Sequence, residues 1–155
     1  MSIDVAGSKV IEGSVEELSE ILAGAIGTAS KLHLYQSSFS PGQNNVYADF
    51  LAAEATFTGY TAVALTWGPV GVDAAGQAVT YSLRANFEAT DGVTPNVIGG
   101  CWVSTQTALG PPVVNKAIRF FPFTTPINMA TALASMAVVV AMQLPNINGY
   151  ATVES

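Results

Sequence analysis

A run of alternating apolar and polar residues over 78–89 constrains the fold more than any other feature of the sequence. Polar residues separate five apolar ones, namely Val79, Tyr81, Leu83, Ala85 and Phe87. Successive side chains of a β-strand point to opposite faces, so a period of two places these five residues on one face. The run therefore predicts a strand of an antiparallel sheet, with this face toward a hydrophobic core and the other in water.

Further segments with the character of short strands follow along the chain, with turn signals between them. They cover residues 32–35, 56–67 (as one strand or a pair), 96–105, 113–121 and 135–144. Residues 129–135 stay open between helix and strand, and residues 46–53 predict a helical turn. Gly99 and Gly100 predict a bulge or a close backbone approach within their strand. About six to eight short strands in this arrangement predict a mainly β fold, an antiparallel β-sandwich of the jelly-roll or immunoglobulin-like type.

The first 30 residues have a different pattern from the rest of the chain. Residues 1–12 predict an extended arm, and Ser14 with Glu17 match the capping box that begins a helix. Apolar residues then recur at spacings of three and four and form one face of this helix, which ends by residue 30. That face consists of Val15, Leu18, Ile21, Leu22 and Ile26, with Ala25 beside it. We therefore divide the chain into an arm and amphipathic helix (1–30), a sandwich (31–145) and a C-terminal tail (146–155).

The N-terminal helix is expected to dock its apolar face on another protein surface. A helix of about 15 residues is marginal in water on its own, so it needs support from other parts of a structure. Because the sandwich begins only after this segment, we expect that support to come from another protein surface, often that of a neighbouring copy of the chain. The acidic side chains Glu16, Glu17 and Glu20 would stay in water.

Charge is scarce in this sequence. Charged residues make up 10% of the 155 residues, against 50% hydrophobic ones, and the net charge is −6. The apolar content excludes intrinsic disorder. The five Lys and Arg residues are scattered and form no basic stripe for nucleic acid. A chain with so few charges is expected to cover part of its surface with copies of itself or with a partner.

Three phenylalanines lie within four residues and also bear on whether the chain forms an interface with another chain. Phe120, Phe121 and Phe123 cannot all point into one core from a single strand. They pack either in the core and at its edge, or at least one of them lies in a subunit interface, where aromatic residues concentrate. We include all three with the apolar helix face as candidate interface residues.

Signals for export and for membrane insertion are missing from the sequence pattern. The N-terminal residues are mostly acidic where a signal peptide needs a basic start and an apolar core. The longest apolar stretch, 129–144, is shorter than the ~20 residues of a typical membrane span and contains Thr131, Ser135 and Gln143. We expect synthesis in the cytoplasm and no membrane anchor.

Candidate catalytic groups are few. His33 is the only histidine and Cys101 the only cysteine, which excludes a disulfide framework. His33 is either a base or, more commonly for such a residue, a hydrogen-bonded position on a strand. Cys101 is expected to be a small buried hydrophobic residue. A metal site at these two residues would need further ligands, which the sequence does not supply.

Carboxylates outside the N-terminal segment offer one pair of interest, Asp49 and Glu54, although a solvated role explains them as well. Asp73 and Asp91 stand in turn contexts, and Glu88 lies on the polar side of its strand. No phosphate-binding loop is present. We therefore expect no catalytic activity, no cofactor and no metal site.

The middle of the chain, residues 31–144, resembles a family of small bacteriophage virion-associated proteins. The resemblance lies in the strand at 32–35, the polar loop 37–45, the ADF motif at 48–50 and, as the most specific part, FTGY at 57–60. A Trp strand, a Gly-containing hairpin, FEAT at 87–90 and IGG at 98–100 continue it. The sequence departs from the family pattern with Gly-Gly-Cys-Trp after Ile98 and with the loop Gly110-Pro111-Pro112. The resemblance implies a component of a phage particle and assigns no functional residue.

The sequence leaves three functions to weigh. The first is a virion structural protein that forms a symmetric homo-oligomer on the capsid (as a decoration or cement protein) or on the tail, with itself and other virion proteins as partners. The second is a carbohydrate- or host-receptor-binding module of a tail fibre or spike, which an exposed Trp67 or Trp102 would favour. The third is a small hydrolase, against which the poverty of His, Cys and clustered acids argues.

Overall fold

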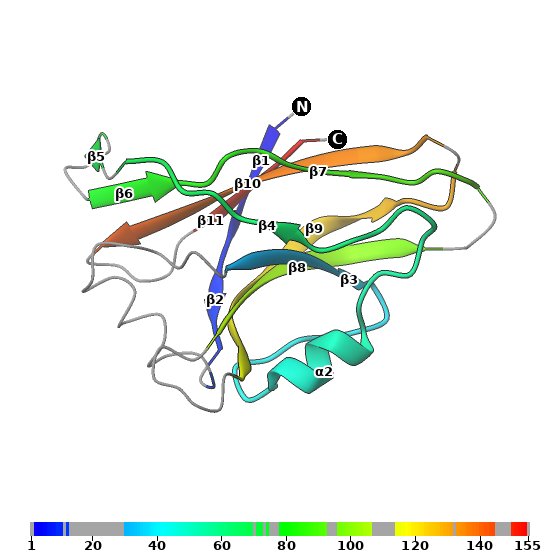
Figure 1. Cartoon of the computed structure of the whole chain (residues 1–155), viewed down its shortest axis with the longest axis horizontal. Helices are drawn as coiled ribbons and strands as arrows, with labels where there is room; N and C mark the ends of the chain where they lie inside the picture. Colours follow the sequence, from blue (N-terminus) through cyan, green and yellow to red (C-terminus); the bar gives the residue numbers. More distant parts are fainter. Residues whose placement is uncertain are drawn as a thin grey trace.

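The computed structural model is mainly β and contains two antiparallel sheets (Figure 1). It describes residues 2–10, 12, 30–69, 71–72, 74, 78–92, 96–106, 114–131, 133–144 and 150–154. The predicted N-terminal helix, with its face of Val15, Leu18, Ile21, Leu22 and Ile26, lies outside these residues. Among the residues that the structure describes, no helix combines the length and apolar character needed to cross a membrane.

The two sheets take their names from their central strands. The β10 sheet has the order β1 (Ser2–Ala6), β11 (Tyr150–Glu154), β10 (Ser135–Leu144), β6 (Ala78–Tyr81) and β5 (Gly71–Val72), and β7 (Ala85–Glu88) also pairs with β10. The β8 sheet has the order β2 (Ser8–Lys9), β9 (Asn115–Asn128), β8 (Val97–Gln106), β3 (Lys31–Gln36) and β4 (Val63–Ala64). The predicted arm therefore contributes a strand to each sheet.

The β8 sheet is buried on both faces. One face shares a core with the β10 sheet, in which Leu32, Leu34 and Phe121 meet Phe87 and Val138. The other face lies under helix α2 (Tyr47–Ala52), where Phe50 packs on Tyr35, Trp102 and Phe120. Figure 1 shows the three layers in this order, with α2 on the side of the β8 sheet away from β10. Alternate residues of β3 and β8 therefore enter two different layers, one between the two sheets and one under α2.

Several predicted elements are present. The strands predicted at 32–35, 96–105 and 135–144 correspond to β3, β8 and β10, and the helical turn at 46–53 corresponds to α2. The strand predicted at 113–121 is found as β9, which continues to Asn128. The two-glycine bulge is confirmed, because the pairing of β8 with β9 shifts between Ile98 and Gly100.

The strand or strand pair predicted over 56–67 is wrong for most of its length. Only β4 and a single bridge from Trp67 to Ser82 are strand-like in this segment. The Tyr60 N–H donates to the Phe57 carbonyl over 3.0 Å. Gly59 has a φ of 96°, a backbone conformation that favours glycine. The FTGY residues therefore form a turn, and the local backbone cannot extend through it.

The prediction that residues 78–89 form one strand with a single inward face is also wrong. Ser82 is hydrogen-bonded to Val140, whereas Ala85 is the partner of Val138. Leu83 and Arg84 thus stand opposite one residue of β10, which is a β-bulge. The extra residue reverses the alternation, because a shift of one residue exchanges the two faces.

The side chains on either side of this bulge show the reversal. Thr80 and Ser82 are buried before it, and Ala85 and Phe87 are buried after it. Tyr81 and Leu83 are 44% and 63% exposed, although the sequence pattern placed both in the core. Val79 is buried, as expected. The two inward hydroxyls are satisfied: Thr80 donates to the Gly68 carbonyl, and Ser82 accepts from the Val140 N–H.

Candidate functional site

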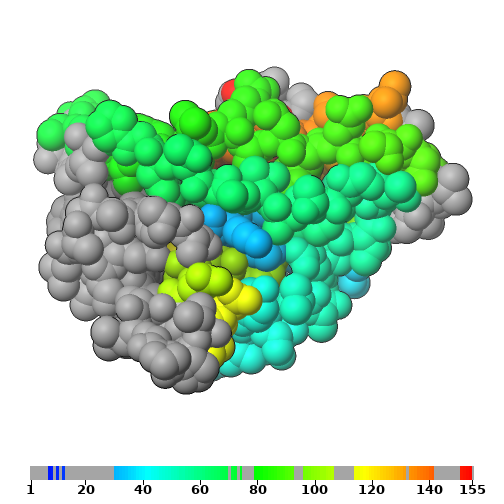
Figure 2. All heavy atoms as spheres, in the orientation of Figure 1, coloured from blue at the N-terminus to red at the C-terminus, as the bar shows by residue number. Residues whose placement is uncertain are grey.

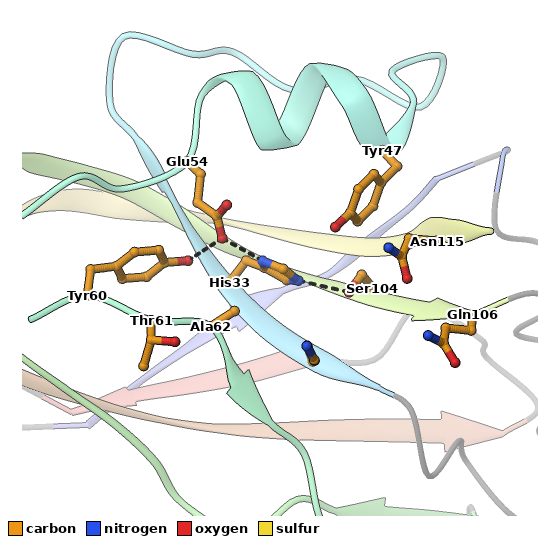
Figure 3. Close-up of a pocket in the computed structure, with 10 residues that line it drawn as sticks. His33, Tyr47, Glu54, Tyr60, Thr61, Ala62, Ser104, Gln106 and Asn115 are labelled. Carbon is orange, nitrogen blue, oxygen red and sulfur yellow. Dashed lines mark hydrogen bonds and ion pairs between the residues drawn. The ribbon is translucent and has the colours of Figure 1, made fainter. Parts of the chain in front are cut away.

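A pocket of about 380 Å³ opens on the α2 side of the β8 sheet. Its lining is mostly polar and comes from β3, α2, the segment before β4, and the adjoining ends of β8 and β9 (Figure 3). The lining residues are Lys31, His33, Tyr47, Glu54, Tyr60, Thr61, Ala62, Ser104, Gln106 and Asn115. In Figure 2 the blue, yellow-green and yellow segments of these strands reach the surface side by side below the green chain.

His33 occupies the inner wall of this pocket and makes two side-chain hydrogen bonds. Its Nδ1 lies 2.6 Å from Glu54 Oε1, and its Nε2 lies 2.8 Å from Ser104 Oγ (Figure 3). The ring stacks on Trp102 with centroids 3.9 Å apart. The register of the strands explains the contact: His33 pairs with Trp102 and Lys31 with Ser104, so Ser104 is the diagonal neighbour of His33 on one face.

Glu54 enters the site from the turn that follows α2. Its carboxylate also accepts a hydrogen bond of 2.6 Å from the Tyr60 hydroxyl, which in turn accepts one of 3.1 Å from the Leu34 N–H. Burial alone raises the pKa of Glu54, but the hydrogen bonds from His33 and Tyr60 outweigh it and leave the pKa below its ordinary value. Glu54 is therefore ionised at neutral pH.

The ionised carboxylate determines which nitrogen of a neutral His33 carries the proton. A carboxylate only accepts hydrogen bonds, so the Nδ1 atom facing Glu54 must hold the hydrogen. The Nε2 atom then has a lone pair, and the Ser104 hydroxyl donates to it. The Ser104, His33 and Glu54 side chains thus form a continuous hydrogen-bonded chain that ends at a hydroxyl in the pocket.

The other candidate chemical groups lie apart from the hydrogen-bonded Ser104, His33 and Glu54 side chains. Cys101 is fully buried between the two sheets, as expected, and burial raises the pKa of its thiol. Asp49 is not paired with Glu54: its carboxylate accepts from the Val46 N–H at 2.9 Å and from Asn45 at 3.2 Å, which lowers its pKa. Glu88 is exposed, as expected. Asp73 lies outside the described residues.

The three phenylalanines of the predicted interface have different surroundings. Phe121 is fully buried between the two sheets, and Phe120 is buried under α2 with its ring 5.9 Å from Phe50. Phe123 is half-buried at the edge of the core. The strand therefore buries Phe120 and Phe121 on its two faces within one chain. Their part in an interface between chains stays a prediction, for which Phe123 is the most accessible of the three.

No family model, no curated protein and no solved structure matches the chain. Within the described parts of the chain, no three His, Cys, Asp or Glu side chains come together in a way that could hold a metal ion.

Replacing Glu54 by glutamine should change how stability depends on pH. Because the folded pKa of Glu54 lies below its unfolded value of about 4.3, the ionised group stabilises the fold above that value and loses its effect as pH falls through the folded pKa. The difference in unfolding free energy between the wild type and Glu54→Gln should shrink below about pH 4. Urea titrations at several pH values measure it. Tyr60→Phe, which removes one of the two hydrogen bonds, should reduce the pH dependence only in part, and a constant difference would contradict the assignment.

Proposed function

We propose that this chain is a structural subunit of a bacteriophage particle, made in the host cytoplasm and assembled as a symmetric homo-oligomer in the virion. It would lie on the capsid as a decoration or cement protein, or on the tail, with itself and other virion proteins as partners. The resemblance of residues 31–144 to phage virion-associated proteins supports the location on a phage particle. An exposed apolar surface supports the formation of an oligomer. The jelly-roll or immunoglobulin-like type of the sandwich belongs to the same proposal.

The observation that carries the assembly is the outward position of Leu83. The β-bulge at Leu83 and Arg84 holds the leucine 63% exposed on the outer face of the β10 sheet, two residues from Tyr81, which is 44% exposed. Bulges redirect side chains. Without this bulge, the alternation of the strand would place Leu83 in the core, and with it the side chain points away from the core. Arg84 pairs with Glu154 at 2.6 Å beside it. An apolar centre with an aromatic ring and a charged rim is the usual composition of a protein interface.

Changing Leu83 to aspartate should separate assembly from folding. The side chain is mostly exposed, so Leu83→Asp should fold with an unchanged circular dichroism spectrum. A charge in the centre of an interface should weaken self-association at least about 10-fold, which light scattering after size-exclusion chromatography measures as a shift toward the 16.0 kDa monomer. Leu133→Asp is the matched control, because Leu133 is 72% exposed at a different place, between β9 and β10. A monomeric wild type, or equal effects of the two variants, would contradict the proposal.

A second candidate is the carbohydrate- or host-receptor-binding module. One observation favours it: the pocket presents hydroxyl, amide and carboxylate groups, including Thr61, Gln106 and Asn115, of the kinds that bind sugar hydroxyls. The exposed tryptophan expected for this function is not found at Trp102, which is fully buried, and Trp67 is half-buried. Titration with common monosaccharides, followed by nuclear magnetic resonance of the pocket residues, tests this alternative.

A further inference from the structure

We propose that Ser104 is an activated nucleophile and that the pocket around it takes the acyl group of a small ester. This inference goes beyond the structural function proposed above and does not depend on it. It concerns a site that the sequence does not reveal, because Ser104 and Glu54 reach His33 only through the fold. The proposal rests on the connectivity of three side chains, on what holds them and on the pocket in which they end.

The connectivity is that of a serine, a base and an orienting acid. The Ser104 Oγ lies 2.8 Å from Nε2 of His33, and the Glu54 carboxylate lies 2.6 Å from Nδ1 on the opposite side of the same ring. Serine nucleophiles of the Ser-His-acid type have this order, in which the base receives the hydroxyl proton and the acid fixes the tautomer of the base. Both distances are within the range for such hydrogen bonds. Glu54 is 21 positions from His33 in the sequence, and Ser104 is 71 positions from it.

The surroundings hold the base and the acid in place. The imidazole lies flat against Trp102, with an interplanar angle of 17°, and the Tyr47 ring meets it edge-on at 6.4 Å. Glu54 is held by the Tyr60 hydroxyl, which the Leu34 N–H fixes from the other side. Glu54 is a positioning residue in this account, because it acts through His33, and its negative charge stabilises the imidazolium that forms when the proton moves.

The pocket supplies both space and hydrogen-bond donors. A volume of about 380 Å³ is at the small end of ligand sites and suits a short acyl group. Lys31, Gln106 and Asn115 line it with N–H groups, the type of donor that stabilises a developing oxyanion. The pairing of β8 with β9 shifts between Val103 and Ser104, and such irregularities often redirect a side chain beside a functional site.

The chemistry balances with water as the only co-reactant. Ser104 Oγ forms a bond to the ester carbonyl carbon while its proton passes to Nε2 of His33. The intermediate then expels the alcohol, which takes that proton, and leaves the acyl group on Ser104. Water, deprotonated by His33, cleaves the acyl–oxygen bond, releases the carboxylic acid and returns the proton to Ser104.

The test is covalent labelling of the full chain with phenylmethylsulfonyl fluoride, followed by intact-mass and peptide mass spectrometry. Ser104 Oγ displaces fluoride from the sulfonyl sulfur, so one sulfonyl group should be found on the peptide that contains Ser104. Ser104→Ala should lose the label, whereas Ser38→Ala, which removes an exposed serine, should keep it. Hydrolysis of p-nitrophenyl acetate should follow the same pattern.

Two further variants separate the mechanism from simple exposure. His33→Gln should abolish labelling, and Glu54→Gln should slow it at least about 10-fold, because the wrong tautomer of the base then faces Ser104. Circular dichroism of each variant establishes that it is folded. A folded wild type that carries no label at Ser104 would overturn the proposal, and labelling at the wild-type rate in Glu54→Gln would overturn the role of the carboxylate.

Discussion

Gly100→Ala should destabilise this chain by about 3 kcal/mol or more, although it adds only one methyl group. A Cβ atom at residue 100 would overlap the Tyr35 hydroxyl and ring and the Phe121 carbonyl oxygen. Both neighbours are buried, Tyr35 at 1% exposure and Phe121 at 0%, and they belong to the two strands that flank β8. The loss is large because neither a paired carbonyl nor a packed ring can move away from the added carbon.

Chemical denaturation measures this loss directly. Gly71→Ala is the matched control, because a Cβ atom at residue 71 would meet nothing within 4 Å. Its stability should stay within about 0.5 kcal/mol of the wild type. Equal denaturation midpoints for Gly100→Ala and the wild type would show that β3, β8 and β9 do not pack as described.

Trp102→Ala should have a comparably large effect. The indole is fully buried, stacks on His33 and lies 5.1 Å from the Phe50 ring and 5.5 Å from Tyr47. It therefore fills the layer between the β8 sheet and α2. Truncating a buried tryptophan to alanine costs about 3–5 kcal/mol, through lost burial and the cavity that remains. Since His33 would lose its stacking partner, the variant should also lose the reactivity of Ser104.

The control for this variant lies on the helix that covers the indole. Leu51 is 45% exposed on α2, so Leu51→Ala should change the unfolding free energy by no more than about 0.5 kcal/mol. Trp102→Phe keeps an aromatic ring in the layer, so its loss of unfolding free energy should lie between those of Leu51→Ala and Trp102→Ala. Thermal and urea unfolding of the three variants check this order, and a small effect of Trp102→Ala would mean that α2 is not held by this layer.

Local patterns in the sequence predicted the elements whose pairing is regular. Residues 135–144 form β10, a strand paired with β11, β6 and β7, and larger apolar residues recur at every second position along it, namely Met136, Val138, Val140, Met142 and Leu144. The sequence pattern does not predict the bulge at Leu83 and Arg84, because a bulge is defined by how the residues pair with the neighbouring strand. The local alternation of apolar and polar residues carries no information about that pairing. The FTGY turn was missed for a related reason, since Gly59 and the hydrogen bond to Phe57 outweigh the strand propensity of the aromatic residues.

The candidate site was predictable only in part. His33 was expected to be a hydrogen-bonded strand residue, and Glu54 was one of the two carboxylates of interest. Their partnership was not expected, because it joins β3 to the turn after α2. Ser104 carried no signal of its own: it reaches His33 through the register of β3 on β8, which is a property of the folded sheet.

Electron cryomicroscopy of phage particles purified from host cells that produce this chain tests the central claim, assembly on a particle, most directly. The account predicts copies of the chain related by a symmetry axis of the capsid or tail, with Leu83 buried in a contact between chains and the segment 14–29 helical against a neighbour. Absence of the chain from purified particles, or a particle in which Leu83 faces solvent in every copy, would contradict it.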